Sequence, residues 1–377
     1  MHRHLKKNLD IEALRALAIG FTILAHIAIV LSPTTAYWRV LAHARFGSGV
    51  DLFFCISGFI ITRSILPELP TRPSLGAFTG LAFPFWARRA QRLLPAALFW
   101  IVIALVATGI VGGDGVFPSL ADQMRAASAA AFQYFNGYWL TCRANNTCGS
   151  LGAYWSLSLE NQFYFLLPIA AAILTRRWLP LLFLAGFLVQ VGMPRNITQP
   201  ETLQAWVFRT DAICLGVLLA FWTERASYQT LMPTFLRSRG WAAAVFLVLC
   251  YLLAVFTDPT PWLQAQTGAV AVVSVALVWI ASYDQGFLVS RAWTRTVVSY
   301  IGSRSYSIYL CHLFVLYVVR DVWTRRGWLD GHHDAAAVVW FIALTWLLAE
   351  ASYRFVERPF LPRRRPAVEA PVAHTIG

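Results

Sequence analysis

Charged residues are scarce in this sequence. Only 13% of its 377 residues are charged, whereas 58% are hydrophobic. Soluble domains carry about 25% charged residues, so this shortage excludes an ordinary soluble domain and leaves no room for a sizeable one beside the apolar segments. Runs of about 20 mainly apolar residues, the length of a membrane-crossing helix, recur from end to end. The composition therefore predicts an all-α protein embedded in a membrane.

Familiar cofactor and nucleophile motifs are also missing. The sequence has no Walker loop, no dinucleotide fingerprint and no paired-cysteine zinc motif. Ser57, in Ile-Ser-Gly, lacks the glycine-x-serine-x-glycine elbow of hydrolases. His332 and His333 are adjacent in a loop, with no further ligand cluster that would hold a metal ion. We therefore expect no metal and no tightly bound cofactor.

Ten apolar runs, separated by turn and charge clusters, predict a polytopic helix bundle with ten transmembrane helices. They cover residues 12–31, 48–66, 91–112, 154–175, 178–193, 205–223, 240–256, 264–283, 298–319 and 336–356. The first run is too long, and lacks the cleavage site, for a removed signal peptide, so it is expected to stay as a helix. With the N-terminus inside, both termini are cytoplasmic.

The formal net charge of +13 alone could indicate a nucleic-acid partner. Most Lys and Arg residues, however, lie on the inner side of the predicted spans or at their inner ends, which the positive-inside rule explains without a nucleic acid. We expect a single transmembrane domain over residues 1–360, in contact with membrane lipid. Residues 361–377, rich in Pro and Arg, are expected to form a disordered cytoplasmic tail.

The segment 113–153 is too polar to span a membrane and too long for a simple turn, so we expect it to cover an outer entrance. It contains Cys142 and Cys148. On the oxidising side these two cysteines could close a small disulfide loop or stay reduced, and their spacing leaves both possibilities open.

Arg15 and His26 interrupt the first apolar run, where ionisable groups are costly and tend to be functional. They lie about three helical turns apart, on nearly the same face and separated by roughly 16 Å along the axis. An acyl-coenzyme A thioester has this shape, with phosphates for Arg15 and a thioester that reaches His26. The alternatives are an arginine that snorkels to the inner interface and a histidine that bonds a backbone carbonyl.

Arg88, Arg89 and Arg92 lie at the start of the third apolar run, and Pro95, one turn into that run, is typical of the start of a helix. Guanidinium groups bind phosphate bidentately, so three arginines on the cytoplasmic side could hold the nucleotide end of a donor. Anchoring to anionic lipid is the alternative.

Five motifs follow one another along nearly the whole chain. Arg15 and His26, separated by ten residues, are followed by GVDLFFCISGF at 49–59, RRAQRLLP at 88–95, YWSLSLENQFY at 154–164 and SYSIYLCH at 305–312. In this order they resemble the acyltransferase 3 family of membrane O-acyltransferases, such as bacterial polysaccharide O-acetyltransferases. One departure is Glu12-Ala13, where the family usually has Asp-Gly.

The resemblance implies a bacterial inner-membrane, multi-pass enzyme that moves an acyl group, usually acetyl, from cytoplasmic acetyl-CoA or another acyl-CoA. The acceptor would be a hydroxyl of a cell-surface carbohydrate such as O-antigen or exopolysaccharide. It assigns catalysis to His26, Glu160 and His312, with His26 as general base or transient acyl carrier. We expect Arg15, Arg88, Arg89 and Arg92 to bind the donor. We expect the acceptor to be bound by Trp155, Ser158, Arg209, Asp211 and Tyr309, of which Arg209 and Asp211 open the sixth span from the outer side.

Each acceptor-side residue has a second interpretation. A carboxylate flanked by aromatic rings, as at Glu160, suits a sugar but also occurs at a membrane interface. Arg209 and Asp211 could form a local ion pair. Tyr309 and His312 share a helix face and could serve the substrate or a structural hydrogen bond.

Two other functions remain open. A transporter or flippase of a lipid-linked sugar would also use intramembrane Arg, His and Glu, although no inverted repeat is visible. An acyltransferase could instead modify a small glycosylated natural product. No soluble esterase-like domain follows the apolar region, which favours a stand-alone enzyme, with polysaccharide-biosynthesis proteins as possible partners.

Overall fold

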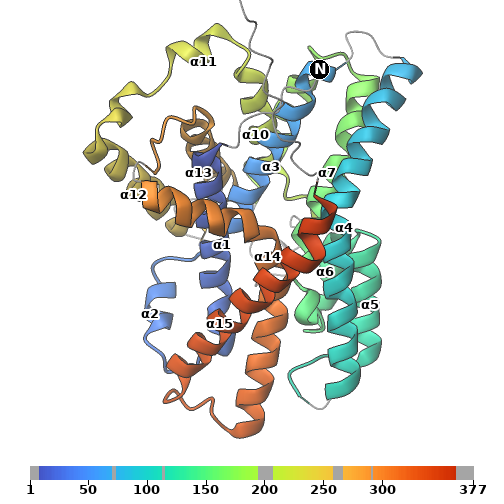
Figure 1. Ribbon diagram of the computed structural model, residues 1–377, viewed down its shortest axis with the longest axis vertical. Helices are drawn as coiled ribbons and strands as arrows, with labels where there is room; N and C mark the ends of the chain where they lie inside the picture. The colour runs from blue at the N-terminus through green and yellow to red at the C-terminus, as the bar shows by residue number, and fades with distance from the viewer. Residues whose placement is uncertain are drawn as a thin grey trace, which may run out of the picture.

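The computed structural model describes residues 8–69, 74–112, 115–193, 207–257, 266–289 and 292–361. Within these ranges the chain is helical and contains no strand, which confirms the all-α prediction (Figure 1). The predicted tail lies outside the described residues, apart from Leu361. Nothing in the described part therefore tests its disorder.

Each of the ten predicted spans coincides with a helix. These helices are α1 (Leu9–Ile27), α3 (Gly49–Ile65), α4 (Leu75–Val111), α7 (Tyr154–Ile173), α8 (Leu179–Gln190), α10 (Asp211–Trp222), α12 (Arg239–Val255), α13 (Gln266–Ser282), α14 (Ala292–Arg326) and α15 (Asp334–Ser352). Among the described residues, five apolar helical stretches are long enough to cross a membrane: Leu9–Val30, Gly49–Glu68, Leu75–Val111, Trp293–Arg326 and Asp334–Phe360. The chain is thus a helical membrane protein.

Helix α4, which corresponds to the third predicted span, begins earlier than predicted. It begins at Leu75, where the Ser74 hydroxyl accepts a hydrogen bond from the Ala77 amide, and both Pro84 and Pro95 lie inside it. The interpretation of Pro95 as a helix start was wrong, because proline is tolerated within membrane helices whose neighbours compensate for the lost hydrogen bond. Arg88, Arg89 and Arg92 consequently stand in the middle of α4 rather than at its beginning.

Glycines allow the central helices to approach closely. A Cβ atom on Gly216 of α10 would collide with the Cys55 carbonyl oxygen of α3, and one on Gly58 would collide with the Ile213 carbonyl oxygen. Gly302 of α14 packs in the same way against the carbonyl oxygen of Glu12 in α1. Small residues at such crossings are the usual means of packing membrane helices, and here they bring α1, α3, α10 and α14 together.

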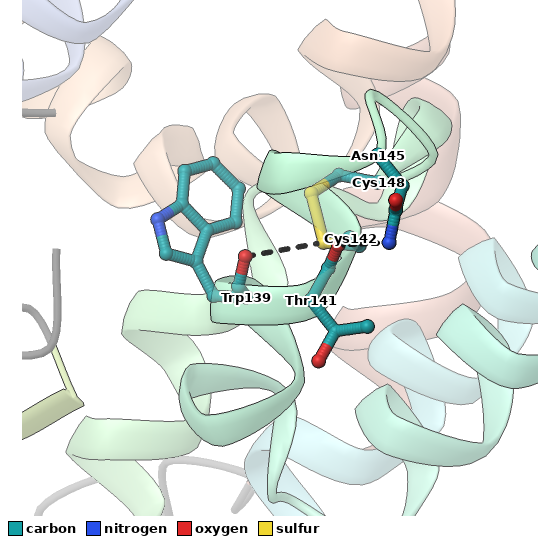
Figure 2. Close-up of a disulfide and its surroundings, with 5 residues drawn as sticks. All are labelled: Trp139, Thr141, Cys142, Asn145 and Cys148. Atoms are coloured by element: carbon teal, nitrogen blue, oxygen red, sulfur yellow. Dashed lines mark hydrogen bonds between the residues drawn. A yellow bond between two sulfur atoms is a disulfide. The ribbon is translucent and has the colours of Figure 1, made fainter. Parts of the chain in front are cut away.

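The segment expected to cover an outer entrance folds into α5 (Leu120–Ala131), α6 (Phe135–Ala144) and the short turn Gly149–Leu151, with α5 beside α4 in Figure 1. Cys142 and Cys148 form a disulfide, which settles the pairing that their spacing left open (Figure 2). The Asn145 side-chain amide donates to the Thr141 carbonyl at 2.9 Å at the C-terminal end of α6. The disulfide therefore closes the end of α6 onto the turn that leads into α7.

We predict that Gly216→Val lowers the thermal unfolding midpoint of the purified protein, because the added methyl groups push α10 away from α3. Overpacking of this kind costs about 1–3 kcal/mol. Gly20→Val is the matched control, since nothing lies within 4 Å of a Cβ at this helical position. Equal midpoints for the two variants in a detergent melting experiment would contradict the close crossing.

Candidate active site

A small cavity of about 110 Å³ lies where α1, α3, α4, α7 and α14 meet. Five of the predicted site residues line it, although they come from four helices that are distant in sequence: Arg15, Arg89, Arg92, Glu160 and Tyr309. Ligand pockets usually measure about 300–1,000 Å³, so this cavity has room only for the reacting end of a larger molecule.

One side of the cavity is cationic. Arg15 lies 3.6 Å from the Glu12 carboxylate, and the Arg89 guanidinium lies 5.7 Å from the ring centres of both Phe85 and Tyr164. Arg92 has no ion-pair partner within the part of the chain that the structure describes. Three arginines beside one lining carboxylate, Glu160, leave the cavity lining with a positive balance, which favours an anionic ligand.

Arg88 is not part of this arrangement. Its side chain is exposed, and it does not line the cavity. Neighbouring positions on a helix point about 100° apart, so the face that presents Arg89 and Arg92 turns Arg88 outward.

The other side of the cavity is acidic. Glu160 Oε1 accepts hydrogen bonds from the hydroxyls of Ser57 and Tyr164, whose oxygens are 3.1 Å apart. Sequence reasoning considered Ser57 only as a nucleophile and did not single out Tyr164. The signal was available in part, because Tyr164 lies one helical turn after Glu160, but the contact with α3 could not be read from spacing.

Two histidines face each other beside the cavity. The ring centres of His26 and His312 are 5.0 Å apart. Nδ1 of His26 lies 2.8 Å from the Thr22 carbonyl oxygen, and Nδ1 of His312 lies 2.6 Å from that of Tyr309. A carbonyl oxygen only accepts hydrogen bonds, so each Nδ1 carries the proton and each neutral ring keeps Nε2 as an acceptor. The two rings can therefore act as bases through Nε2.

Tyr309 connects the cavity to the histidine pair. Its ring lines the cavity and lies 5.4 Å from the His312 ring, as their spacing on α14 predicts, whereas neither histidine lines the cavity. The Tyr309 hydroxyl is 2.6 Å from that of Ser156 and donates to the Ala153 carbonyl at 3.2 Å. Ala153 directly precedes α7 and Ser156 lies in its first turn, so the helix that carries Glu160 holds the tyrosine in place.

The remaining predicted acceptor residues do not line the cavity. The Arg209 guanidinium forms a bidentate pair with Asp51 of α3, with Nε 2.8 Å from Oδ1. The Ser158 hydroxyl accepts from the Phe135 amide at 3.1 Å and so fastens the start of α6. Trp155 packs edge-on against Phe54. Asp211 is buried at the start of α10.

A buried carboxylate near the cavity was not anticipated. Glu357 is only 3% exposed and accepts a hydrogen bond of 2.8 Å from the Ser307 hydroxyl. The π-helix Tyr353–Glu357 turns it inward, and Arg92, Arg15 and Arg304 are the cations that act on it electrostatically. Glu357 follows the last predicted span, 336–356, and charged residues at the end of a span are common at the membrane interface. Its burial was therefore not expected.

Comparison with known proteins identifies the protein family. Residues 8–350 match the model of the acyltransferase domain. The chain belongs to the acyltransferase 3 family. No solved structure matches it.

Among curated members of this family, O-acetyltransferase OatA of Staphylococcus aureus strain NCTC 8325 is 28% identical over 384 residues, which covers 94% of this chain and 59% of that protein. A protein of S. aureus strain COL, named provisionally as an O-acetyltransferase, is 28% identical over 335 residues, or 83% of this chain and 52% of that protein. The chain thus spans about half the length of the curated relatives that it matches.

We predict that Arg209→Ala strongly destabilises the fold, because it leaves the Asp51 carboxylate buried without this cation. Breaking a buried pair costs about 3–5 kcal/mol, whereas the double variant Asp51→Ala/Arg209→Ala should recover part of the loss. Arg176→Ala is the control, since its pair with Glu224 is exposed and worth at most about 1 kcal/mol. If chemical unfolding shows similar losses for Arg209→Ala and Arg176→Ala, the pair does not hold α3 to the segment before α10.

Proposed function

We propose that this protein is an integral membrane O-acetyltransferase that moves an acetyl group from cytoplasmic acetyl-CoA to a hydroxyl of a cell-surface carbohydrate. The observation that carries the proposal is a cavity with three arginines and a carboxylate, adjoined by two imidazoles that present Nε2. The names of the family's curated relatives support acetyl as the group transferred.

The arginines would bind the donor. Arg89 and Arg92 share the α4 face that lines the cavity, and Arg15 faces them from α1. Their guanidinium groups match the developing oxyanion of the thioester carbonyl, which lies in the part of the donor that the cavity admits. Because the cavity is small, only the acetyl thioester end enters it, and the nucleotide end stays toward the cytoplasm.

The imidazoles would move the proton. Nε2 of His26 removes the proton from the acceptor hydroxyl while the hydroxyl oxygen attacks the thioester carbonyl carbon. The carbon–sulfur bond then breaks, and the proton passes from His26 to the departing thiolate, which leaves as free coenzyme A. His312 lies beside His26 and would hold it in position or share the proton. Direct transfer needs no acetyl-histidine intermediate.

Tyr309 and Glu160 would control the acceptor. Glu160 has two hydroxyl donors in the structure, and a sugar hydroxyl can replace either of them. Displacement of the Tyr309 ring would then open the cavity to the histidines. Until that point the tyrosine keeps the imidazoles away from the thioester, which limits attack by water.

The proposed topology has ten spans with both termini in the cytoplasm of a bacterial cell and the domain in the inner membrane. Four shorter apolar helical stretches, Leu179–Gln190, Asp211–Trp222, Arg239–Val255 and Gly268–Ser282, would complete the bundle together with α7. The cavity joins the arginines expected on the inner side to Glu160, expected nearer the outer side. Donor and acceptor motifs therefore meet within the membrane.

We predict that His26→Ala reduces acetyl transfer by about two to four orders of magnitude while the protein still inserts in the membrane, because the variant lacks the proton acceptor. The assay follows release of free coenzyme A from acetyl-CoA in the presence of an acceptor. His43→Ala is the control, since His43 is exposed outside the cavity. Near-normal transfer by a well-expressed His26→Ala variant would exclude the general-base role.

We predict that Arg92→Ala and Arg89→Ala weaken acetyl-CoA binding by about ten- to a hundredfold, the value of a charge-assisted hydrogen bond. Arg88→Ala, on the same helix but facing away, should bind the donor normally. Calorimetric titration with acetyl-CoA measures the donor affinity of all three variants. A similar loss in Arg88→Ala would mean that these arginines act through general charge and membrane anchoring.

A further inference from the structure

A second, larger cavity opens beside the first. It measures about 510 Å³ and lies between α4, the end of α5 and α7. It shares Arg89, Leu93 and Tyr164 with the candidate active site, so these three side chains form the wall between the two cavities. Its volume falls within the usual range for a ligand pocket, and a small headgroup would fit.

The rim of this lateral cavity is apolar and exposed. Phe132 is 79% exposed, Leu166 57% and Phe165 53%. The Phe165 ring stacks on Trp86 with ring centres 4.9 Å apart. On a membrane protein such exposed rings and aliphatic chains face hydrocarbon, so an apolar tail can lie along this rim.

The floor of the same cavity is polar. Asn161 Nδ2 donates to Gln133 Oε1 at 2.7 Å, and Gln162 Nε2 donates to the Gln133 carbonyl at 2.8 Å. Gln133 itself adopts a left-handed φ of 60° at the end of α5, a backbone conformation that costs energy in a residue other than glycine. These carboxamides are hydrogen-bonded within the protein and also line the cavity, and an amide that keeps a free lone pair or N–H can pair with a hydroxyl group.

We propose that this lateral cavity binds the headgroup of a membrane-anchored acceptor, a hydroxyl-bearing sugar on an apolar tail, which enters from the lipid. The inference rests on the proposed acetyl transfer and names its acceptor class. The sugar lies on the carboxamides of Gln133, Asn161 and Gln162, its tail follows Phe132 and Leu166, and its hydroxyl reaches Glu160 past Tyr164. Arg89, in the shared wall, faces both substrates.

Photolabelling tests this without depending on catalysis. The protein is placed in phosphatidylcholine nanodiscs and exposed to dodecyl maltoside that carries a diazirine near the sugar. Mass spectrometry should find adducts on residues 86–94 and 161–166, and excess dodecyl maltoside should compete whereas free maltose should not. His26→Ala should label normally, so loss of acetyl transfer and loss of acceptor binding are distinguished.

Two variants outside the catalytic residues sharpen the test. Leu166→Trp fills the cavity and should abolish the specific adducts, whereas Leu188→Trp, at an exposed position of α8, should leave them unchanged. Asn161→Leu removes one hydrogen-bonding amide and should lower labelling about three- to tenfold. Adducts spread evenly over the lipid-facing surface, or equal labelling of Leu166→Trp and Leu188→Trp, would show that the cavity holds bilayer lipid only and overturn the proposal.

Discussion

The cost of placing charge inside a membrane protein governs this structure. Arginine side chains in a low-dielectric interior are stable only beside carboxylates, aromatic faces or an anionic ligand. Arg209 has the first kind of partner in Asp51, and Arg304 has Glu350 together with the ring of Tyr300, 3.6 Å from its guanidinium. The arginines of the cavity are less completely matched. We propose that an anionic substrate supplies the missing partner in the cavity.

Close helix packing and buried polar contacts explain how the helices are arranged around the cavity. Glycine crossings bring α1 against α14 and α3 against α10, and the first crossing allows the histidines on α1 and α14 to meet. The buried pair between Asp51 and Arg209 joins α3 to the segment before α10. Ser156 and Tyr309 then tie the start of α7 to α14. Packing and polar contacts therefore converge on the positions of His26, Glu160 and Tyr309.

Much of this was predictable from local sequence. All ten helices could be placed from apolar runs, because a hydrophobic stretch of sufficient length is a strong signal, and Arg15 and His26 were conspicuous within one. The start of α4 was missed because Pro95 is compatible with either a helix start or a helix interior. The partners of Arg209 and Glu160 were missed because Asp51 and Ser57 lie on another helix. Spacing along one helix carries no information on such contacts.

The position of Tyr309 sets a further condition on the chemistry. Tyr309 lines the cavity and contacts His312, whereas neither histidine lines the cavity. In the proposed mechanism this ring therefore moves before a thioester in the cavity meets the bases. Such a separation suits an enzyme that would otherwise hydrolyse its donor. In the proposed mechanism the arginines that line the cavity would serve the donor and Glu160 the acceptor, as a transfer between two substrates requires.

The central claim is that acetyl passes from a donor bound on the cytoplasmic side to an acceptor reached through the membrane domain. In the most direct test, the protein is placed in sealed vesicles that are either inside-out or right-side-out. Acetyl-CoA with an isotopically labelled acetyl group is then added outside the vesicles. Inside-out vesicles should transfer label to the acceptor fraction, and right-side-out vesicles should not until they are permeabilised. Equal transfer by intact vesicles of both orientations, or transfer by right-side-out vesicles alone, would contradict the account.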